Sequence, residues 1–402
     1  MILLRISIWR KLCCSRALNR KAPRPAAAHK PLFLAMGVWA MLVPWVWIWP
    51  ELVPDPAFWH AHELIFGVAV AALGGYLLIA LPSWTGPNHR HRIGYPSLAL
   101  LLLAWGLGRA AILSGAQGLG LWGSVVLYPL GLAALMLPPL WRARVWRKLP
   151  LAAVPVALAV ADVVWLATQG GNGHPIGLAL VLGFALLLSV VGGRALPAFF
   201  NSRFAAGGQP VLQLRAIGVL ASGAIALSLG AVIAQRADLA GAALLLAGAL
   251  QGLRMMVWAR WGVIAQFDLL MLYLAWGWLV LGLLLLGRAL WLGDAGTPAT
   301  MLHGLTLGAM GAMIMAVTAR AFMTRAPGRL LASPAHAAAI ALISIAAVLR
   351  LAFPTAEAMG LTGLHWSVMA WSLGWACYLL PLLRGLAQPS PHPVLGAKRL
   401  SA

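Results

Sequence analysis

The chain alternates between long apolar stretches and short polar or basic connections. Twelve apolar stretches are about 20 residues long, the length that an α-helix needs to cross a bilayer core of about 30 Å. These stretches do not alternate between polar and apolar positions as membrane strands do, so they are predicted to be helices. The sequence therefore predicts an all-α, polytopic membrane protein with about twelve transmembrane helices in one bundle. The predicted spans are 31–49, 60–82, 95–113, 119–140, 150–168, 175–199, 214–234, 239–258, 268–290, 298–320, 334–353 and 363–386.

The connections between these spans are too short to hold a soluble domain, and two of them carry turn signals at 170–173 and 326–328. The domain prediction is a basic tail over 1–30, a membrane domain over 31–386 and a short tail over 387–402. No convincing internal repeat is visible.

Composition supports the membrane class and removes two others. Apolar residues make up 62% of the chain and charged residues only 9%, against about 25% charged in an ordinary soluble domain. Such a chain has too few charges to cover a soluble enzyme and too much apolar surface to stay disordered. Cys13, Cys14 and Cys377 form no C-x-x-C or C-x-x-C-H motif, so neither thiol redox chemistry nor covalent haem attachment is predicted.

The net charge of +21 indicates how the chain is oriented in the membrane. With the N-terminus placed in the cytoplasm, all but four of the Lys and Arg residues fall on the cytoplasmic side; the four on the outer side are Arg109, Arg236, Arg288 and Arg350. This asymmetry is a strong positive-inside signal and predicts that both termini are cytoplasmic. The basic residues are spread over seven inner segments rather than one patch, so nucleic acid is not an expected partner.

The charge-poor outer half holds the most informative side chains. His60, His62 and Glu63 begin the second predicted span, and His303 lies about 9 Å deep in the tenth. Ionisable residues inside spans are costly and usually functional, and imidazole is a ligand for copper, iron and zinc. Residues two apart on a helix point about 200° apart, so His60 and His62 serve two centres, or one of them belongs to the preceding loop.

Glu63 lies three residues after His60, and we expect it to share that face and to hold a ring N–H, as a support to a metal ligand. The alternative is an interfacial cluster at the start of a helix, where Glu63 suits the positive end of the helix dipole.

Two further features of the sequence are candidate cofactor contacts. Gly304, Gly308 and Ala312 form a smooth stripe in the tenth span, which allows close helix packing or leaves room for a flat macrocycle. Arg194 stands just before Pro197 and would pair with a propionate or carboxylate, or act as an interfacial anchor. Pro197 is predicted to kink or end the sixth span.

At these residues the chain resembles the NnrS family of bacterial membrane proteins. The matching blocks run in order from Trp59-His60-Ala61-His62-Glu63 and Ala80–Gly86, through Gly192-Gly193-Arg194…Pro197…Phe199 and Arg254…Trp258, to His303…Gly311…Arg320 and Tyr378…Pro381. The resemblance implies a twelve-span inner-membrane protein that carries non-covalent b-type haem and copper. It also implies a role in nitric oxide metabolism or resistance to nitrosative stress, with the bilayer and nitric oxide or a related small molecule as partners. The implied metal ligands are His60, His62 and His303, with Glu63 and Arg194 as further cofactor contacts.

Three positions depart from the family pattern. Tyr273 stands where the family has a histidine, the segment 325–329 replaces a His-Thr-Gly-Arg motif, and Ser83 replaces an asparagine. These departures imply an altered or missing centre on the inner side, although Tyr also ligates haem iron.

Two other functions stay open at this point, and enzymatic turnover is not decided. A secondary transporter would need a polar site near the membrane midplane, where only Asp162 is a weak candidate and no proton relay is obvious. A non-catalytic assembly or protective protein is the other alternative.

Overall fold

The computed structural model describes residues 29–86, 93–168, 175–204, 210–293, 297–326, 329–386, 388, 394 and 395. Within these residues, twelve helices are long and apolar enough to cross a membrane. Their bounds differ from the predicted spans by at most four residues, so the twelve-helix prediction is confirmed. The predicted tail over 1–30 lies outside the described residues except for His29 and Lys30, which begin the first helix.

The first five spans form one side of the bundle. Several are built from two or three helical segments that follow one another without a break. Their elements are α2 (His29–Leu42) with η1 (Val43–Trp47), α3 (Pro56–His62) with η3 (Glu63–Ala69) and α4 (Val70–Trp84), α5 (Tyr95–Leu113), α6 (Gly118–Arg142), and η5 (Trp146–Lys148) with α7 (Leu149–Ala167). A short turn of helix, η2 (Pro50–Leu52), joins the first two spans.

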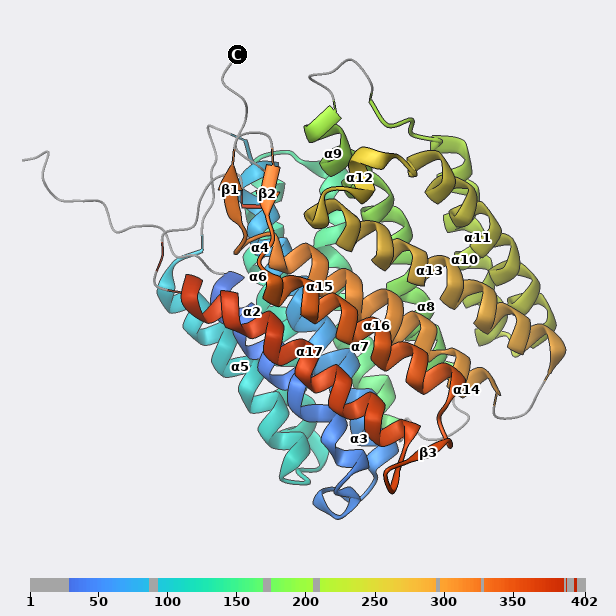
Figure 1. Ribbon diagram of the computed structural model, residues 1–402. Helices are drawn as coiled ribbons and strands as arrows, with labels where there is room; N and C mark the ends of the chain where they lie inside the picture. The colour runs from blue at the N-terminus through green and yellow to red at the C-terminus, as the bar shows by residue number, and fades with distance from the viewer. Residues whose placement is uncertain are drawn as a thin grey trace, which may run out of the picture.

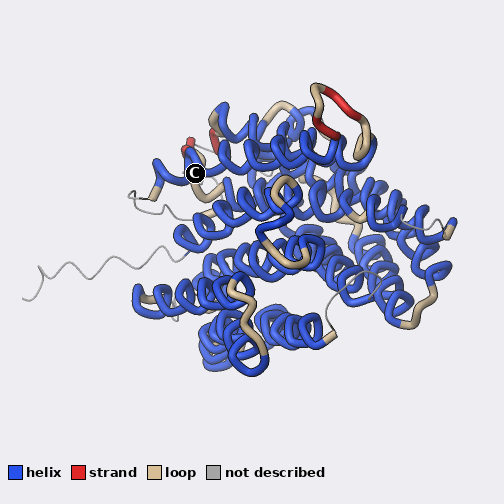
Figure 2. Tube along the Cα trace, turned by 90° about the horizontal axis from the view of Figure 1, so that it is seen from below, coloured by secondary structure: helices blue, strands red, loops and turns tan. Residues whose placement is uncertain are grey.

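The remaining seven spans complete the bundle. Their elements are α8 (Pro175–Leu187) with η6 (Leu188–Gly192) and α9 (Gly193–Phe204), α10 (Arg215–Ile233), α11 (Ala237–Trp258), α13 (Phe267–Leu292), α14 (Thr297–Met301) with η8 (Gly304–Gly311) and α15 (Ala312–Ala319), α16 (Pro334–Ala352), and α17 (Gly363–Gly385). The short helix α12 (Trp261–Ile264) joins α11 to α13. The strands of the described chain form two antiparallel hairpins, β1 (Thr324–Ala326) with β2 (Arg329–Leu331), and β3 (Glu357–Ala358) with β4 (Leu361–Thr362); Figure 2 shows helices almost everywhere else.

The two ends of the described chain meet along one side of the bundle. Helix α17 packs against α16 and against α2, while α10, α11 and α13 form the opposite flank (Figure 1). The second span is the most deeply buried of the twelve, and α13 turns Trp276, Leu279 and Leu283 fully into the interior. Many leucines on the outer helices are exposed, as expected for side chains that face lipid.

Three spans share an unusual backbone. The second, sixth and tenth each contain a π-helical segment, η3, η6 and η8 respectively. π-Helical turns inside α-helices are rare and frequent at functional sites. Side chains from these three spans line most of one apolar cavity with an open volume of about 820 Å³, here called the central cavity. The three irregular helices therefore surround a common space.

The second span begins four residues earlier than predicted. Asp55 caps α3 by accepting a hydrogen bond from the Phe58 backbone N–H at 2.9 Å, and Pro56 occupies the first helical turn. Both are standard helix-start residues. The earlier start places His60 and His62 inside the helix rather than in the preceding loop.

Pro197 does not end the sixth span, because α9 continues through it to Phe204. A proline has no N–H for the carbonyl four residues earlier, and that carbonyl belongs to Gly193. The helix is π-helical just before this point, in η6, and the Gly193 carbonyl finds another donor, Arg254.

Candidate functional site

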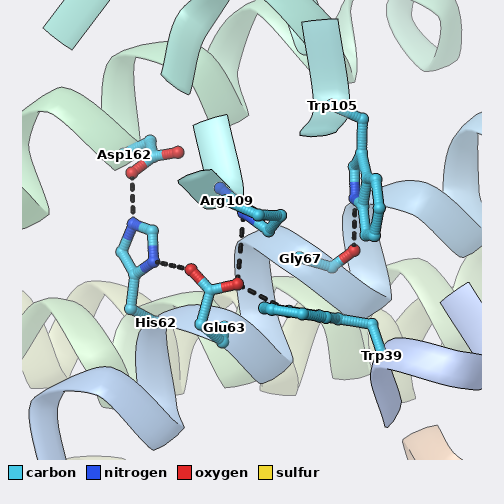
Figure 3. A network of polar contacts seen from close by, with 7 residues as sticks. All are labelled: Trp39, His62, Glu63, Gly67, Trp105, Arg109 and Asp162. Atoms are coloured by element: carbon cyan, nitrogen blue, oxygen red, sulfur yellow. Dashed lines mark hydrogen bonds and ion pairs between the residues drawn. The ribbon is translucent and has the colours of Figure 1, made fainter. Parts of the chain in front are cut away.

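His62 is clamped between two carboxylates inside the bundle. Its Nε2 lies 2.8 Å from Oδ1 of Asp162 on α7, and its Nδ1 lies 3.0 Å from Oε1 of the neighbouring Glu63. All three side chains are buried. Figure 3 shows the imidazole bridging the two carboxyl groups.

The second oxygen of Glu63 holds two more residues. Trp39 donates its indole N–H to Oε2 at 2.6 Å, and Nε of the buried Arg109 lies 3.1 Å from the same oxygen. Trp105 donates to the carbonyl of Gly67 at 2.9 Å beside them (Figure 3). We call His62, Glu63, Asp162, Arg109 and Trp39 the buried network. It joins spans 1, 2, 3 and 5.

The charges of the buried network balance when His62 carries both ring protons. An ionised carboxylate only accepts hydrogen bonds, so a bond to each carboxylate requires an N–H at each ring nitrogen. The imidazolium and Arg109 would then match Glu63 and Asp162 one for one. Both ring nitrogens of His62 are engaged in this arrangement, so neither has a lone pair free for a metal.

Two residues of the buried network bear on the expectations from the sequence. Glu63 does not hold His60; its hydrogen bonds go to His62 and Trp39, and the expectation that it shares the face of His60 is wrong. Asp162, weighed above as a weak candidate for a transporter site, meets the ionisable ring of His62 in the interior.

His60 points to a different part of the bundle from His62. Its ring lies edge-on to Trp47, with centroids 5.5 Å apart. Its Nδ1 is buried and has no hydrogen-bond partner among the described residues. His303, from the tenth span, is close enough to interact electrostatically with His60, and Arg350 of α16 lies near both rings. Two histidines that are far apart in the sequence thus lie within electrostatic range of each other.

The ring of His303 is oriented by its own helix. Nδ1 lies 3.0 Å from the carbonyl oxygen of Ala299 and 3.2 Å from that of Thr300. A carbonyl oxygen only accepts, so Nδ1 carries the proton, and Nε2 of the neutral ring keeps its lone pair. A backbone carbonyl that fixes the tautomer in this way is typical of metal-binding histidines.

His60 and His303, here called the histidine pair, are only two candidate metal ligands. Among the described residues, no group of three or more His, Cys, Asp or Glu side chains is arranged to hold a metal ion. His365, also on the predicted outer side, is engaged at Nδ1 by Thr362, whose Oγ1 lies 2.7 Å away. His174 lies outside the described residues.

The glycine stripe of the tenth span serves helix packing. A Cβ atom at Gly308 would lie 2.6 Å from the Trp278 ring. Gly304 is packed against the backbone of Gly282. The space above the stripe is therefore filled, and a flat macrocycle does not fit against it.

Arg194 belongs to neither histidine site. Arg194 lies near the end of the sixth span, whereas His60 and His303 lie near the starts of the second and tenth spans. Because successive spans alternate in direction, these three spans run the same way, and Arg194 lies at the opposite end of the bundle from the two histidines. There it lines a cavity with an open volume of about 1400 Å³, which we call the basic pocket. The polar residues that line the basic pocket are Arg147, Ser189, Arg194, Gln213, Arg215, Ser222 and Arg254.

A second ion pair is buried at the same end. Arg320 Nη1 donates to Oδ2 of Asp268 at 2.8 Å, and its Nε donates to the Leu395 carbonyl at 3.0 Å. The guanidinium also lies over the Phe199 ring, 4.4 Å from its centroid. Burial lowers the pKa of Arg320, and the Asp268 carboxylate opposes that shift.

The departures from the family pattern lie near this end as well. Tyr273 donates its hydroxyl to the Met255 carbonyl at 3.3 Å, which ties α13 to α11. Arg325 lies in β1 and donates to carbonyls of Met323 and Val394. These contacts give both residues a structural role.

Sequence reasoning missed Arg109 and Arg350 as site residues. Both belong to the four arginines assigned to the outer side, where positive charge is disfavoured. The positive-inside rule does not explain an arginine inside an apolar span on the outer side. Such a position therefore would have identified Arg109 and Arg350 as site candidates.

A twelve-helix bundle with buried ion pairs and three π-helical spans defines a polytopic α-helical membrane protein with an interior polar site. The sequence matches the family model described as NnrS protein over residues 25–390, nearly the whole chain, so the chain belongs to the NnrS family. No curated protein matches it.

Proposed function

We propose that this protein binds copper at the His60–His303 pair and handles nitric oxide there. The proposal rests on two imidazoles from different spans that lie within electrostatic range of each other. Each has a ring nitrogen available: the orphaned Nδ1 of His60 and the lone pair on Nε2 of His303. Membership of the NnrS family supports a link to nitric oxide.

The residues fit copper better than haem. Imidazole suits copper, and the pair offers two such ligands that backbone and aromatic contacts already orient. A haem would need a flat space beside His303, but Trp278 and the backbone of Gly282 fill the space over Gly308 and Gly304 that would provide it. Bound copper would supply a site for a diatomic ligand and for one-electron chemistry.

The surroundings of the pair suit nitrogen oxides. Arg350 places a positive charge near both rings and would attract an anion such as nitrite. The central cavity is lined mainly by apolar side chains, Met310 and Met313 among them, and apolar cavities in proteins take up small apolar guests. Nitric oxide is such a guest, so the cavity would act as a reservoir for it within the bundle.

Metal analysis of the purified protein tests this proposal. We expect about one copper per chain in the unmodified protein, and loss of most of it in His60→Ala and in His303→Ala. The control is His365→Asn, at a histidine on the predicted outer side whose ring caps α17, which should keep its copper. An anaerobic spectrum with nitric oxide should change in the control and not in the two alanine variants.

Two outcomes would contradict the proposal. Copper that survives both alanine substitutions would place the metal elsewhere. A Soret band that disappears with the same substitutions would show that the pair holds haem iron instead.

A further inference from the structure

The basic pocket concentrates positive charge that the protein does not neutralise. Arg147, Arg194, Arg215 and Arg254 come from four different segments, and none of the described residues that line the pocket is acidic. The described carboxylates lie toward the other end of the spans, apart from Asp268, which is paired with Arg320. An uncompensated cluster of guanidinium groups favours an anion.

Arg254 is the buried member of the cluster. It is only 6% exposed, and its guanidinium lies over the rings of both Trp258 and Trp276. Its Nη1 donates to the Gln251 side chain and its Nη2 to the Gly193 carbonyl, each at 2.9 Å, and both acceptors are neutral. Its Nε has no hydrogen-bond partner among the described residues. A buried cation without a counter-charge is costly, so an anion in the pocket would stabilise it.

The basic pocket opens into a long apolar groove. Arg147, Val190 and Arg194 line both the pocket and the groove, which has an open volume of about 1970 Å³. The groove runs between α7 and α8 as far as Ile176, about 27 Å from Arg194 at 1.5 Å per helical residue. Its cationic residues, Arg147, Lys148 and Arg194, all lie at the pocket end, and its other side chains are almost all apolar.

We propose that the basic pocket and the groove together bind an anionic phospholipid, with its phosphate on the arginines and an acyl chain along the groove. Guanidinium groups match the geometry of phosphate oxygens, and basic pockets between transmembrane helices recognise acidic headgroups. The groove favours a lipid over a free phosphate ion as the ligand, because only a lipid has a long apolar part to occupy it. This site is separate from the histidine pair and does not depend on copper.

Native mass spectrometry of the delipidated full chain tests the headgroup contact. We expect phosphatidylglycerol to be retained and phosphatidylcholine with the same acyl chains to be lost. In the double variant Arg194→Gln/Arg215→Gln, affinity for phosphatidylglycerol should fall roughly fivefold for each arginine, since one cation near an anionic headgroup contributes about 1 kcal/mol. The control is Arg142→Gln, an exposed arginine at the same end that does not line the pocket; its affinity should be unchanged.

A second pair of variants tests the groove. Ala157 lines the groove, and its neighbour Val156 is exposed on α7 without lining it. Ala157→Trp should therefore weaken retention of phosphatidylglycerol, and Val156→Trp should not. The helical content and melting temperature of each variant confirm that it has folded.

Three results would overturn the proposal. The first is equal retention of the anionic and zwitterionic lipids, or of phosphatidylglycerol by the double variant and the unmodified protein. The second is thermal protection by inorganic phosphate alone that equals protection by the lipid, which would assign the pocket to a free ion. The third is a loss of haem from the double variant with unchanged lipid retention, which would assign the arginines to propionates.

Discussion

The imidazole of His62 lies 2.8 Å from the carboxylate of Asp162, although 100 residues separate them in the sequence. This contact joins the second span to the fifth inside the bundle, where both side chains are buried. The same ring bonds to Glu63 on its other side, so both ring nitrogens of His62 lie against carboxyl groups.

Removing Asp162 should destabilise the fold. In Asp162→Ala the Nε2 of His62 loses its acceptor in the interior, and breaking a buried charge pair costs about 3–5 kcal/mol. Asp162→Asn keeps an acceptor oxygen and should cost less. Thermal unfolding in detergent, followed by circular dichroism, measures both. The control is Asp238→Ala, which breaks an exposed pair with Arg236 and should change little; equal losses at 162 and 238 would show that the buried network does not stabilise the bundle.

His60 and His62 should separate in their effects, if the proposed copper site is correct. His62→Ala removes the centre of the buried network and should lower the melting temperature by several degrees while copper content stays close to that of the unmodified protein. His60→Ala removes an imidazole with no hydrogen bond at Nδ1, so it should lower copper content with a much smaller effect on melting. Metal analysis and melting curves on the same preparations decide the matter. The opposite pattern would make His62 the ligand.

Close backbone approach between α13 and η8 should make Gly282 intolerant of a side chain. A Cβ atom there would lie 2.7 Å from the carbonyl carbon of Gly304, and backbone cannot move as a flexible side chain does. Gly282→Ala should therefore destabilise the protein by about 1–3 kcal/mol through overpacking. Gly106→Ala on α5 meets no atom within 4 Å and should be neutral or slightly stabilising. Denaturant unfolding in detergent compares the two, and tolerance of Gly282→Ala would mean that the helices separate readily.

Arg320 should hold Leu395 against the bundle. Arg320→Lys keeps the charge but loses the planar group that bonds both Asp268 and Leu395 and lies over Phe199. Loss of a hydrogen bond from a charged group costs about 1.5–3 kcal/mol, so cleavage next to Leu395 should become roughly ten- to a hundredfold faster. Limited proteolysis followed by mass spectrometry measures the rate. The control is Arg384→Lys on α17, and equal rates in the two variants would contradict the role of Arg320.

The sequence by itself determined the number of spans, the helical class and the candidate histidines. Twelve apolar stretches have only one way to satisfy their backbone groups in lipid, which is to form helices. The segments that match the NnrS family contain His60, His62 and His303, so these candidate ligands could also be identified from the sequence. The placement of both termini in the cytoplasm, predicted from the distribution of arginines, stays a prediction.

Only the tertiary structure decided which of these side chains meet. His62 pairs with Asp162 and Glu63, whereas His60 lies against Trp47 and within electrostatic range of His303. A helix directs residues two apart to different neighbours, and hydropathy does not say which neighbours those are. The π-helical segments and the packing of Arg254 against Gly193 were equally hidden, since local propensity does not predict them. Apolar pattern fixes what enters the membrane, and the packing of one span on another fixes what each buried polar group contacts there.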